Sequence, residues 1–74
     1  MRDYSHAAAV TPSNTIDLPT TAWALIVGAN GTVKIDTFWG ETVTFTAVAG
    51  YVYNIRAKRV YATGTSATSI VAFW

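Results

Sequence analysis

From residue 20 to the C-terminus, hydrophobic and polar residues alternate at the period of two that is typical of β-strands. The clearest example is the segment ETVTFTAV at residues 41–48, in which Val43, Phe45 and Ala47 share one face and threonines occupy the other. This pattern predicts a strand with one face toward a hydrophobic core. No window shows the period of a helix, because β-branched and aromatic residues dominate and glycines recur at short intervals.

Four more segments are predicted to form strands: residues 22–28, 32–38, 51–62 and 70–74. The first is apolar on both faces, so we expect it in the middle of a sheet, with Trp23 in the core. In the third, the alternation slips where Lys58 and Arg59 adjoin, which predicts a β-bulge or a break.

Turn signals separate these segments. Asn30-Gly31 predicts a β-hairpin, because both residues tolerate a positive φ. Trp39-Gly40 and Ala49-Gly50 mark further bends, and residues 63–69 are predicted to form a polar loop. We therefore predict an all-β fold, a small single-domain barrel or sandwich of about six short antiparallel strands, with the pairing order left open.

The first 19 residues have a different character. They mix charge, alanine, threonine, serine and two prolines, Pro12 and Pro19, without a clean period. We expect residues 1–19 to form an extended N-terminal arm that is ordered by what it touches, and residues 20–74 to form the β domain.

The size of the chain points to assembly. A domain of 74 residues buries only about 60% of the surface that its unfolded chain exposes. Small scaffolds compensate with disulfides, a metal or oligomerisation. Cysteine is absent and His6 is the only histidine, so oligomerisation is the most economical of the three. The composition agrees, since 51% of residues are hydrophobic and only 12% are charged, against about 25% charged in an average domain.

The C-terminal segment IVAFW is the best candidate for a subunit contact. A terminal strand that stayed half exposed would be an aggregation hazard, and cover by another subunit would remove it. Tryptophan is also enriched at the centres of interfaces, and Trp39 lies beside a glycine in a turn. The predicted subunit interface consists of Trp39, Ile70, Val71, Phe73 and Trp74.

The sequence contains few candidate catalytic residues. The acidic residues occur singly, at Asp3, Asp17, Asp36 and Glu41. No spacing pairs two carboxylates or combines a nucleophile with a base, so we predict that the protein is not an enzyme and holds no metal or cofactor. No apolar run approaches the roughly 20 residues of a membrane helix, and the N-terminus lacks the hydrophobic stretch of a signal peptide.

Nucleic acid binding is the alternative function. Basic residues interleaved with aromatic ones on strands are how small barrels hold single strands. The candidate contacts are Tyr51, Tyr53, Arg56, Lys58, Arg59 and Tyr61. A net charge of +1 argues against it, and a solvated strand edge or a salt-bridged subunit contact explains the same residues. A third possibility is a carbohydrate-binding surface built on Trp39.

An ordered series of short motifs resembles the head spike base family of gene transfer agents and tailed phages. The series covers residues 11–74 and consists of Asp17-Leu18-Pro19, Val27-Gly28, Thr42 to Phe45, Arg56 to Val60 and Ala62 to Trp74. Lys58 is a conservative departure from the family's basic strand, and the arm is shorter than in the family.

The resemblance implies a virion structural protein on the capsid surface, assembled in the host cytoplasm. Its partners would be copies of itself, as a trimer or a pentamer, the major capsid protein, and a spike or fibre protein if one is attached. It would act either as a spike base or as a decoration (cement) protein of the shell. The arm would then supply the capsid contacts, through Tyr4, His6, Val10 and Pro12.

Overall fold

The alternating pattern of the sequence becomes a set of short strands. The computed structural model describes residues 4–74, and within that range every regular element is a strand. The strands are β1 (Ala7–Ala9), β2 (Ala24–Ile26), β3 (Gly31–Thr37), β4 (Thr42–Ala47), β5 (Val52–Tyr53), β6 (Ala57–Val60) and β7 (Val71–Phe73). The prediction of an all-β domain is confirmed.

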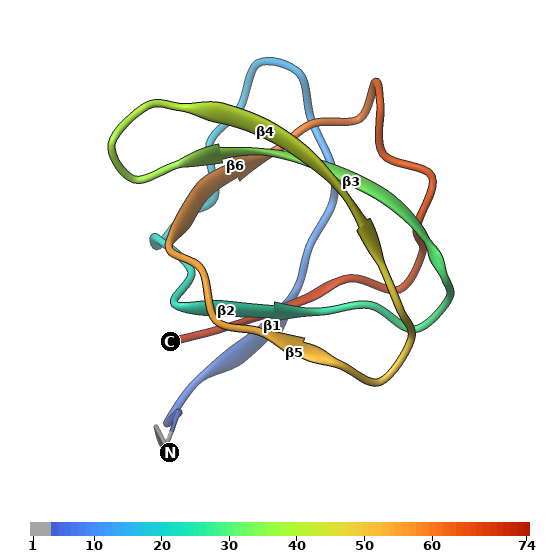
Figure 1. The fold of residues 1–74 in the computed structure, drawn as a ribbon. Coiled ribbons are helices and arrows are strands. Elements are labelled where there is room, and N and C mark those ends of the chain that lie inside the picture. The colour runs from blue at the N-terminus through green and yellow to red at the C-terminus, as the bar shows by residue number, and fades with distance from the viewer. Residues whose placement is uncertain (1–3) are drawn as a thin grey trace.

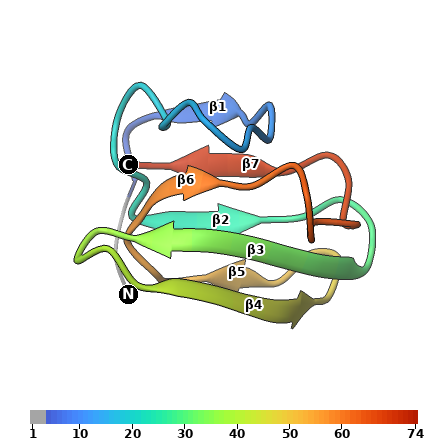
Figure 2. The same cartoon turned by 90° about the horizontal axis from the view of Figure 1, so that it is seen from above.

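The strands form two antiparallel sheets that face each other (Figure 1). The larger sheet has the order β1-β7-β2-β5, and the smaller has the order β4-β3-β6. Seen from above, β1 and β7 lie at one side of the molecule and β4 and β5 at the other (Figure 2). A pair of backbone hydrogen bonds between Ala22 and Ala57, of 2.8 and 3.1 Å, joins the start of β2 to β6 and so connects the sheets.

The strand β2 lies between β7 and β5, which confirms its predicted central place. The C-terminal strand β7 is also interior, because β1 pairs along one edge and β2 along the other. Its edges are therefore covered within the chain, which differs from the expectation of a half-exposed terminal strand. The cover comes from the N-terminal segment, which the sequence pattern did not show to be a strand.

The prediction of a hairpin at Asn30-Gly31 is wrong. The strands on either side of it, β2 and β3, belong to different sheets, and neither residue has a positive φ. Gly31 is needed for another reason. A Cβ atom there would lie 2.5 Å from the backbone nitrogen of Ala67, so only glycine lets β3 approach the loop of residues 63–69.

The predicted irregularity at Lys58-Arg59 is confirmed as a β-bulge. On β3, Asp36 faces Arg59 and Thr37 faces Ala57, so Lys58 is the extra residue. The predicted strand of residues 51–62 is divided into β5 and β6, which belong to different sheets. Residues 54–56 carry the chain from one sheet to the other.

The N-terminal segment is extended and runs along its own domain. After β1 pairs with β7, the amides of Ser13 and Leu18 donate to the carbonyls of Val60 and Lys58, at 2.8 and 2.7 Å. Val10 and Leu18 also pack against the core. Residues 1–3 of the expected arm lie outside the described residues.

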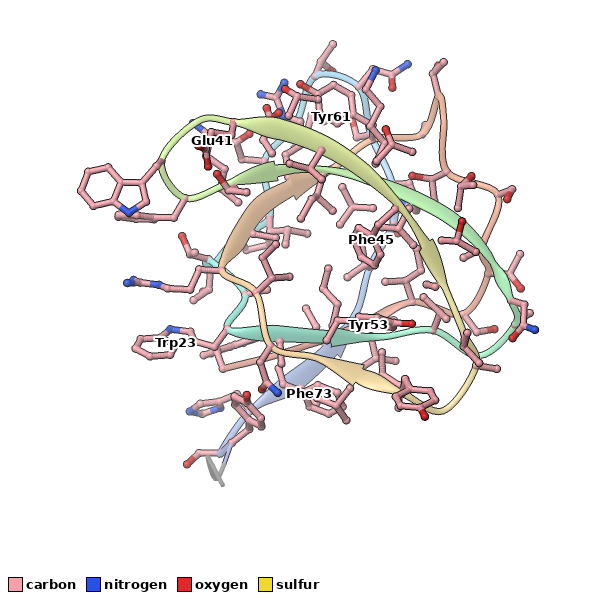
Figure 3. All side chains as sticks on the ribbon, in the orientation of Figure 1. Trp23, Glu41, Phe45, Tyr53, Tyr61 and Phe73 are labelled. Atoms are coloured by element: carbon pink, nitrogen blue, oxygen red, sulfur yellow. The ribbon has the colours of Figure 1, made fainter. Side chains whose placement is uncertain are left out.

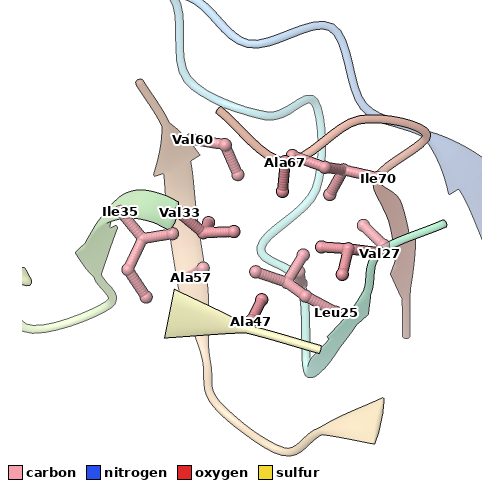
Figure 4. Packing of buried hydrophobic residues seen from close by; sticks show 11 residues of the cluster. Leu25, Val27, Val33, Ile35, Ala47, Ala57, Val60, Ala67 and Ile70 are labelled. Carbon is pink, nitrogen blue, oxygen red and sulfur yellow. The ribbon is translucent and has the colours of Figure 1, made fainter. Parts of the chain in front are cut away.

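The core is built from small and aliphatic side chains (Figure 4). Its largest fully buried members are Leu25, Ile35, Val33 and Val60. Val27, Ile70 and six alanines complete the set of buried hydrophobic residues; the alanines are Ala22, Ala24, Ala47, Ala57, Ala67 and Ala72. All the aromatic side chains lie within residues 4–74, and none of them is fully buried. Trp23 is half-buried and not in the core, contrary to expectation.

Asp36 is the one charged side chain that is buried among the described residues, with 9% of its surface exposed. Its carboxylate accepts hydrogen bonds from the hydroxyls of Thr42 at 2.5 Å and Tyr61 at 2.8 Å. The Thr42 hydrogen bond is the main reason that the pKa of Asp36 lies below its usual value. The Tyr61 hydrogen bond and the charge of Arg59 also lower this pKa, whereas partial burial of the carboxylate raises it.

We expect Gly31→Ala to lower the free energy of unfolding by about 1–3 kcal/mol, because the added methyl group overpacks a backbone contact. Urea denaturation followed by circular dichroism would measure it. Ser5→Ala, on an exposed side chain, is the control. Equal stability of Gly31→Ala and the parent protein would show that the 63–69 loop does not press on β3.

The stability of the protein should fall as the pH drops below about 4. Because the folded-state pKa of Asp36 is lowered, its contribution is complete above the unfolded-state pKa and is lost as the pH falls through the folded-state value. Asp36→Asn should therefore be less stable than the parent at neutral pH, and the difference should shrink in acid. Urea midpoints measured from neutral to acidic pH would test this, and a constant difference would contradict it.

Candidate contact surfaces

The exposed large hydrophobic residues are concentrated on one part of the chain. They are Ile16, Phe38, Trp39, Val43, Val48, Tyr51 and Val52. All except Ile16 fall between residues 38 and 52, on the β3–β4 turn, β4, the β4–β5 turn and β5. Exposed apolar residues that follow one strand and its two turns are candidates for an interaction site.

The two sheets do not pair with each other at β4 and β5, which are edge strands. A shallow apolar groove of about 270 Å³ lies there, the β4–β5 groove, lined by Val43, Phe45, Tyr53, Asn54 and Ile55. The Phe45 and Tyr53 rings pack against each other in its lining, with ring centroids 5.2 Å apart (Figure 3). The Tyr53 hydroxyl accepts a hydrogen bond of 2.9 Å from the Val48 amide, which fixes its ring.

The β3–β4 turn holds Trp39 out from the domain. The Trp39 side chain is 87% exposed and touches the edge of the Phe38 ring, with centroids 5.7 Å apart. The turn itself is well tied, because the Gly40 amide donates to the Thr37 carbonyl at 2.9 Å and the Thr37 amide donates to the Glu41 carbonyl at 2.8 Å. A large apolar side chain is thus presented to solvent on a fixed backbone.

Beside this turn, Arg56 is held between two aromatic rings. Its guanidinium carbon lies 4.6 Å from the centroids of both Trp23 and Phe38. Stacking of this kind orients an arginine and leaves its N–H groups at the edge free to donate. Together with Trp39, these residues form an aromatic surface at one end of the barrel.

The residues predicted for a subunit interface occupy two positions in the fold. The views in Figures 1 and 2 place the β3–β4 turn and the C-terminus at the same end of the molecule. Val71, Phe73 and Trp74 are half-buried, whereas Ile70 is 3% exposed and belongs to the chain's own core. The structure therefore brings the Trp39 turn and the end of β7 to one end, and it places Ile70 inside.

The predicted capsid contacts lie along the N-terminal segment. The Tyr4 hydroxyl donates a hydrogen bond to the Asn54 side chain, and its ring lies 5.8 Å from that of Phe73. His6 is exposed and stacks on Trp74, with centroids 5.7 Å apart. Val10 packs against the core and Pro12 is half-buried. Tyr4 and His6 lie at the end that carries the C-terminus.

The structure divides the six candidate nucleic acid contacts into separate groups. Tyr53 lines the β4–β5 groove, and the centroid of its ring lies 6.4 Å from that of the exposed Tyr51. Arg56 is stacked in the aromatic surface, and Lys58 is in the bulge.

The remaining two candidates, Arg59 and Tyr61, are bonded to acidic side chains of the same chain. Arg59 forms an ion pair of 2.7 Å with Asp17, which raises the pKa of the arginine and offsets its charge. The Tyr61 hydroxyl donates to Asp36. A single basic and aromatic platform is therefore not formed.

Two further searches cover the described residues only. Among residues 4–74, no three His, Cys, Asp or Glu side chains form a group that could hold a metal ion. The same residues contain no helix of the length and hydrophobicity that a membrane span requires.

Sequence reasoning missed most of the exposed apolar surface. Val43 and Phe45 alternate correctly with threonines, and that pattern was interpreted as the buried face of a strand. The interpretation holds for Ala47, which is buried, but Val43 is 40% exposed because β4 is an edge strand next to an open groove. The signal that was present in the sequence is the cluster of valines and tyrosines around Gly50.

No family model matches the sequence, and no curated protein matches it. Among solved structures, a chain in a structure titled "Capsid of native GTA particle computed with C5 symmetry" has the same fold, with a TM-score of 0.89. The two chains are 38% identical, over 97% of this chain and 84% of that one. This chain belongs to the family of that gene transfer agent (GTA) capsid protein. The similarity to that GTA capsid chain extends over nearly the whole of this chain, and so it includes the N-terminal segment as well as the β domain.

Deleting Phe73 and Trp74 should detach β1 and leave a chain that aggregates or fails to assemble. The deletion removes the stacking partner of His6 and the backbone hydrogen bonds of Trp74 with Ser5 and His6, so the edge of β7 is uncovered. Light scattering and solubility would measure the result. A deletion variant that keeps the parent's assembly state and solubility would contradict it.

Proposed function

We propose that this protein is a structural protein of the capsid surface of a gene transfer agent or a related phage-like particle, and that it acts by binding. The observation that carries the proposal is the 38% identity, at a TM-score of 0.89, with a chain of a native GTA capsid. An identity of that size over 97% of the chain is well beyond a similarity of fold alone. A non-enzymatic role agrees with the sequence, in which the acidic residues occur singly and no spacing pairs two carboxylates.

The finer role that we propose is an oligomeric head spike base or a decoration protein. The ordered motifs of the sequence support it, and so does the aromatic surface at one end of the barrel. A base must bind the shell on one side and present another surface to a fibre or to solvent. Here the N-terminal segment supplies the shell contact, and the β4–β5 groove is a distinct apolar surface for a further protein contact.

We further propose that five copies assemble around a capsid vertex. The GTA capsid structure was computed with C5 symmetry, and a ring of five copies would fit a five-fold position of such a particle. In this arrangement the major capsid protein contacts the N-terminal segment, through Tyr4, His6, Val10 and Pro12. Trp39 and the end of β7, with Val71, Phe73 and Trp74, lie near subunit boundaries. A trimer at a local three-fold position is the other arrangement that the sequence allows.

Particles purified from producing cells would test the capsid role. We expect the protein to co-sediment with nuclease-resistant particles and to be labelled on intact particles by antibodies. The labelling must occur without disruption of the shell, since a surface protein is accessible from outside. Absence from the particle fraction, or labelling only after disruption, would contradict the proposal. A cytoplasmic protein of the producing cell is the control for contamination.

The oligomer should resist salt. Contacts made by apolar side chains are not weakened by salt, whereas binding to nucleic acid phosphates weakens steeply as salt rises. Native mass spectrometry and light scattering across a salt series would give the subunit count. A mass that collapses to the monomer as salt rises would contradict apolar assembly, and oligonucleotide binding under the same conditions would favour the alternative function.

A further inference from the structure

We propose that the β4–β5 groove of one copy binds the Trp39 side chain of the next copy, in a head-to-tail contact. This inference rests on the proposed function, because it identifies the surfaces through which the capsid-surface oligomer would assemble. It commits the groove to a second copy of this chain and not to the major capsid protein or a fibre. The argument depends on the groove, the exposed side chain and their different positions on one chain.

The groove has the size and chemistry for one large apolar side chain. Its volume of about 270 Å³ equals that of about nine water molecules in the liquid, at roughly 30 Å³ each. Four of its five lining residues are valine, isoleucine, phenylalanine and tyrosine, and the Phe45–Tyr53 pair forms an aromatic floor. Aromatic rings in such pairs gain from further edge or offset contacts.

Trp39 is the side chain that fits. Its surface is 87% exposed, the largest exposed fraction among the large hydrophobic side chains of residues 4–74, and within those residues its ring packs at the edge of the Phe38 ring. The Thr37 and Glu41 hydrogen bonds hold the turn, so little backbone entropy is lost when the side chain is buried by a neighbour. Tryptophans of this kind are the usual anchors of interfaces.

The groove also offers the polar partner that a buried indole requires. A buried indole N–H needs an acceptor. Asn54 lines the groove, and its side-chain oxygen accepts one hydrogen bond from the Tyr4 hydroxyl. An amide oxygen has two lone pairs, so it can accept a second hydrogen bond from Trp39 of the neighbouring copy.

The positions of the two surfaces determine the kind of assembly. The indole projects from the β3–β4 turn and the groove lies between β4 and β5, so one copy uses different patches for its two neighbours. A contact of this type is heterologous and can close into a ring. A closed ring of five copies is the form that this contact takes in the proposed vertex assembly. A two-fold contact between two Trp39 side chains would leave every groove empty.

Two variants separate the halves of the contact. Trp39→Ala removes the side chain that is bound and keeps the groove. Val43→Glu places a charge in the groove and keeps Trp39. Both positions are exposed, at 87% and 40%, so neither change creates a core cavity, and circular dichroism would verify the fold. Ile16→Ala is the matched control, because Ile16 is 71% exposed and lies outside the groove.

Native mass spectrometry and light scattering of the full chain would provide the test. We expect the parent protein and Ile16→Ala to form the same closed oligomer. Each of the other two variants should be monomeric at the same concentration, with the subunit dissociation constant raised about 30-fold or more, as for an interface hot spot.

Mixing the two variants gives the decisive result. Val43→Glu retains Trp39 and Trp39→Ala retains the groove, so one intact contact can form between them. The mixture should therefore yield a 1:1 complex and no ring. A mixture that remains monomeric would overturn the proposal, since Trp39 and the groove would then not contact each other. Retention of the parent's mass by either single variant would also overturn it.

A parent protein that stays monomeric at all concentrations would overturn the inference but not the capsid role. The particle co-sedimentation described above tests that role without reference to self-association. If particles contain the protein and the parent is monomeric in solution, the groove binds a capsid or fibre component instead. If particles lack it, the proposed function fails whatever the result of the mixing experiment.

Discussion

The fold depends on a constraint of size, because two short sheets close on a core that has room only for small and aliphatic side chains. Leu25, Val33, Ile35 and Val60 are the largest fully buried side chains, and six of the other buried residues are alanines. Every aromatic ring is therefore left at the periphery. A chain of this length cannot cover its large apolar side chains by itself, since its surface is large relative to its volume.

The peripheral aromatic residues are partly accommodated by local contacts. Trp23 and Phe38 stack on Arg56, Trp74 stacks on His6, and Phe45 packs on Tyr53. Trp39 has the least cover, and the β4–β5 groove has no occupant from its own domain. The same constraint that keeps the core small thus produces the exposed apolar surface, which connects the architecture with assembly.

Some strand edges are covered by other parts of the same chain. The N-terminal segment covers β7 through β1 and bonds to the carbonyls of β6 through Ser13 and Leu18. The edge at β4 and β5 has no such cover. This chain therefore covers the edges of β7 and β6 with its own N-terminal segment and leaves the β4 and β5 edges open beside the apolar groove.

The sequence by itself determined the strand class, the central place of residues 22–28, the bulge at Lys58 and the exposure of Trp39. These features depend on periods of two, on runs of apolar residues and on turn residues, all of which are local. The tertiary structure alone decided that β2 and β3 enter different sheets, that residues 7–9 pair with the last strand, and that Val43 and Phe45 border a groove. Those outcomes depend on which distant segments meet. Gly31 illustrates the reason, because its local signal indicated a turn, whereas the contact that requires glycine is with Ala67, 36 positions away.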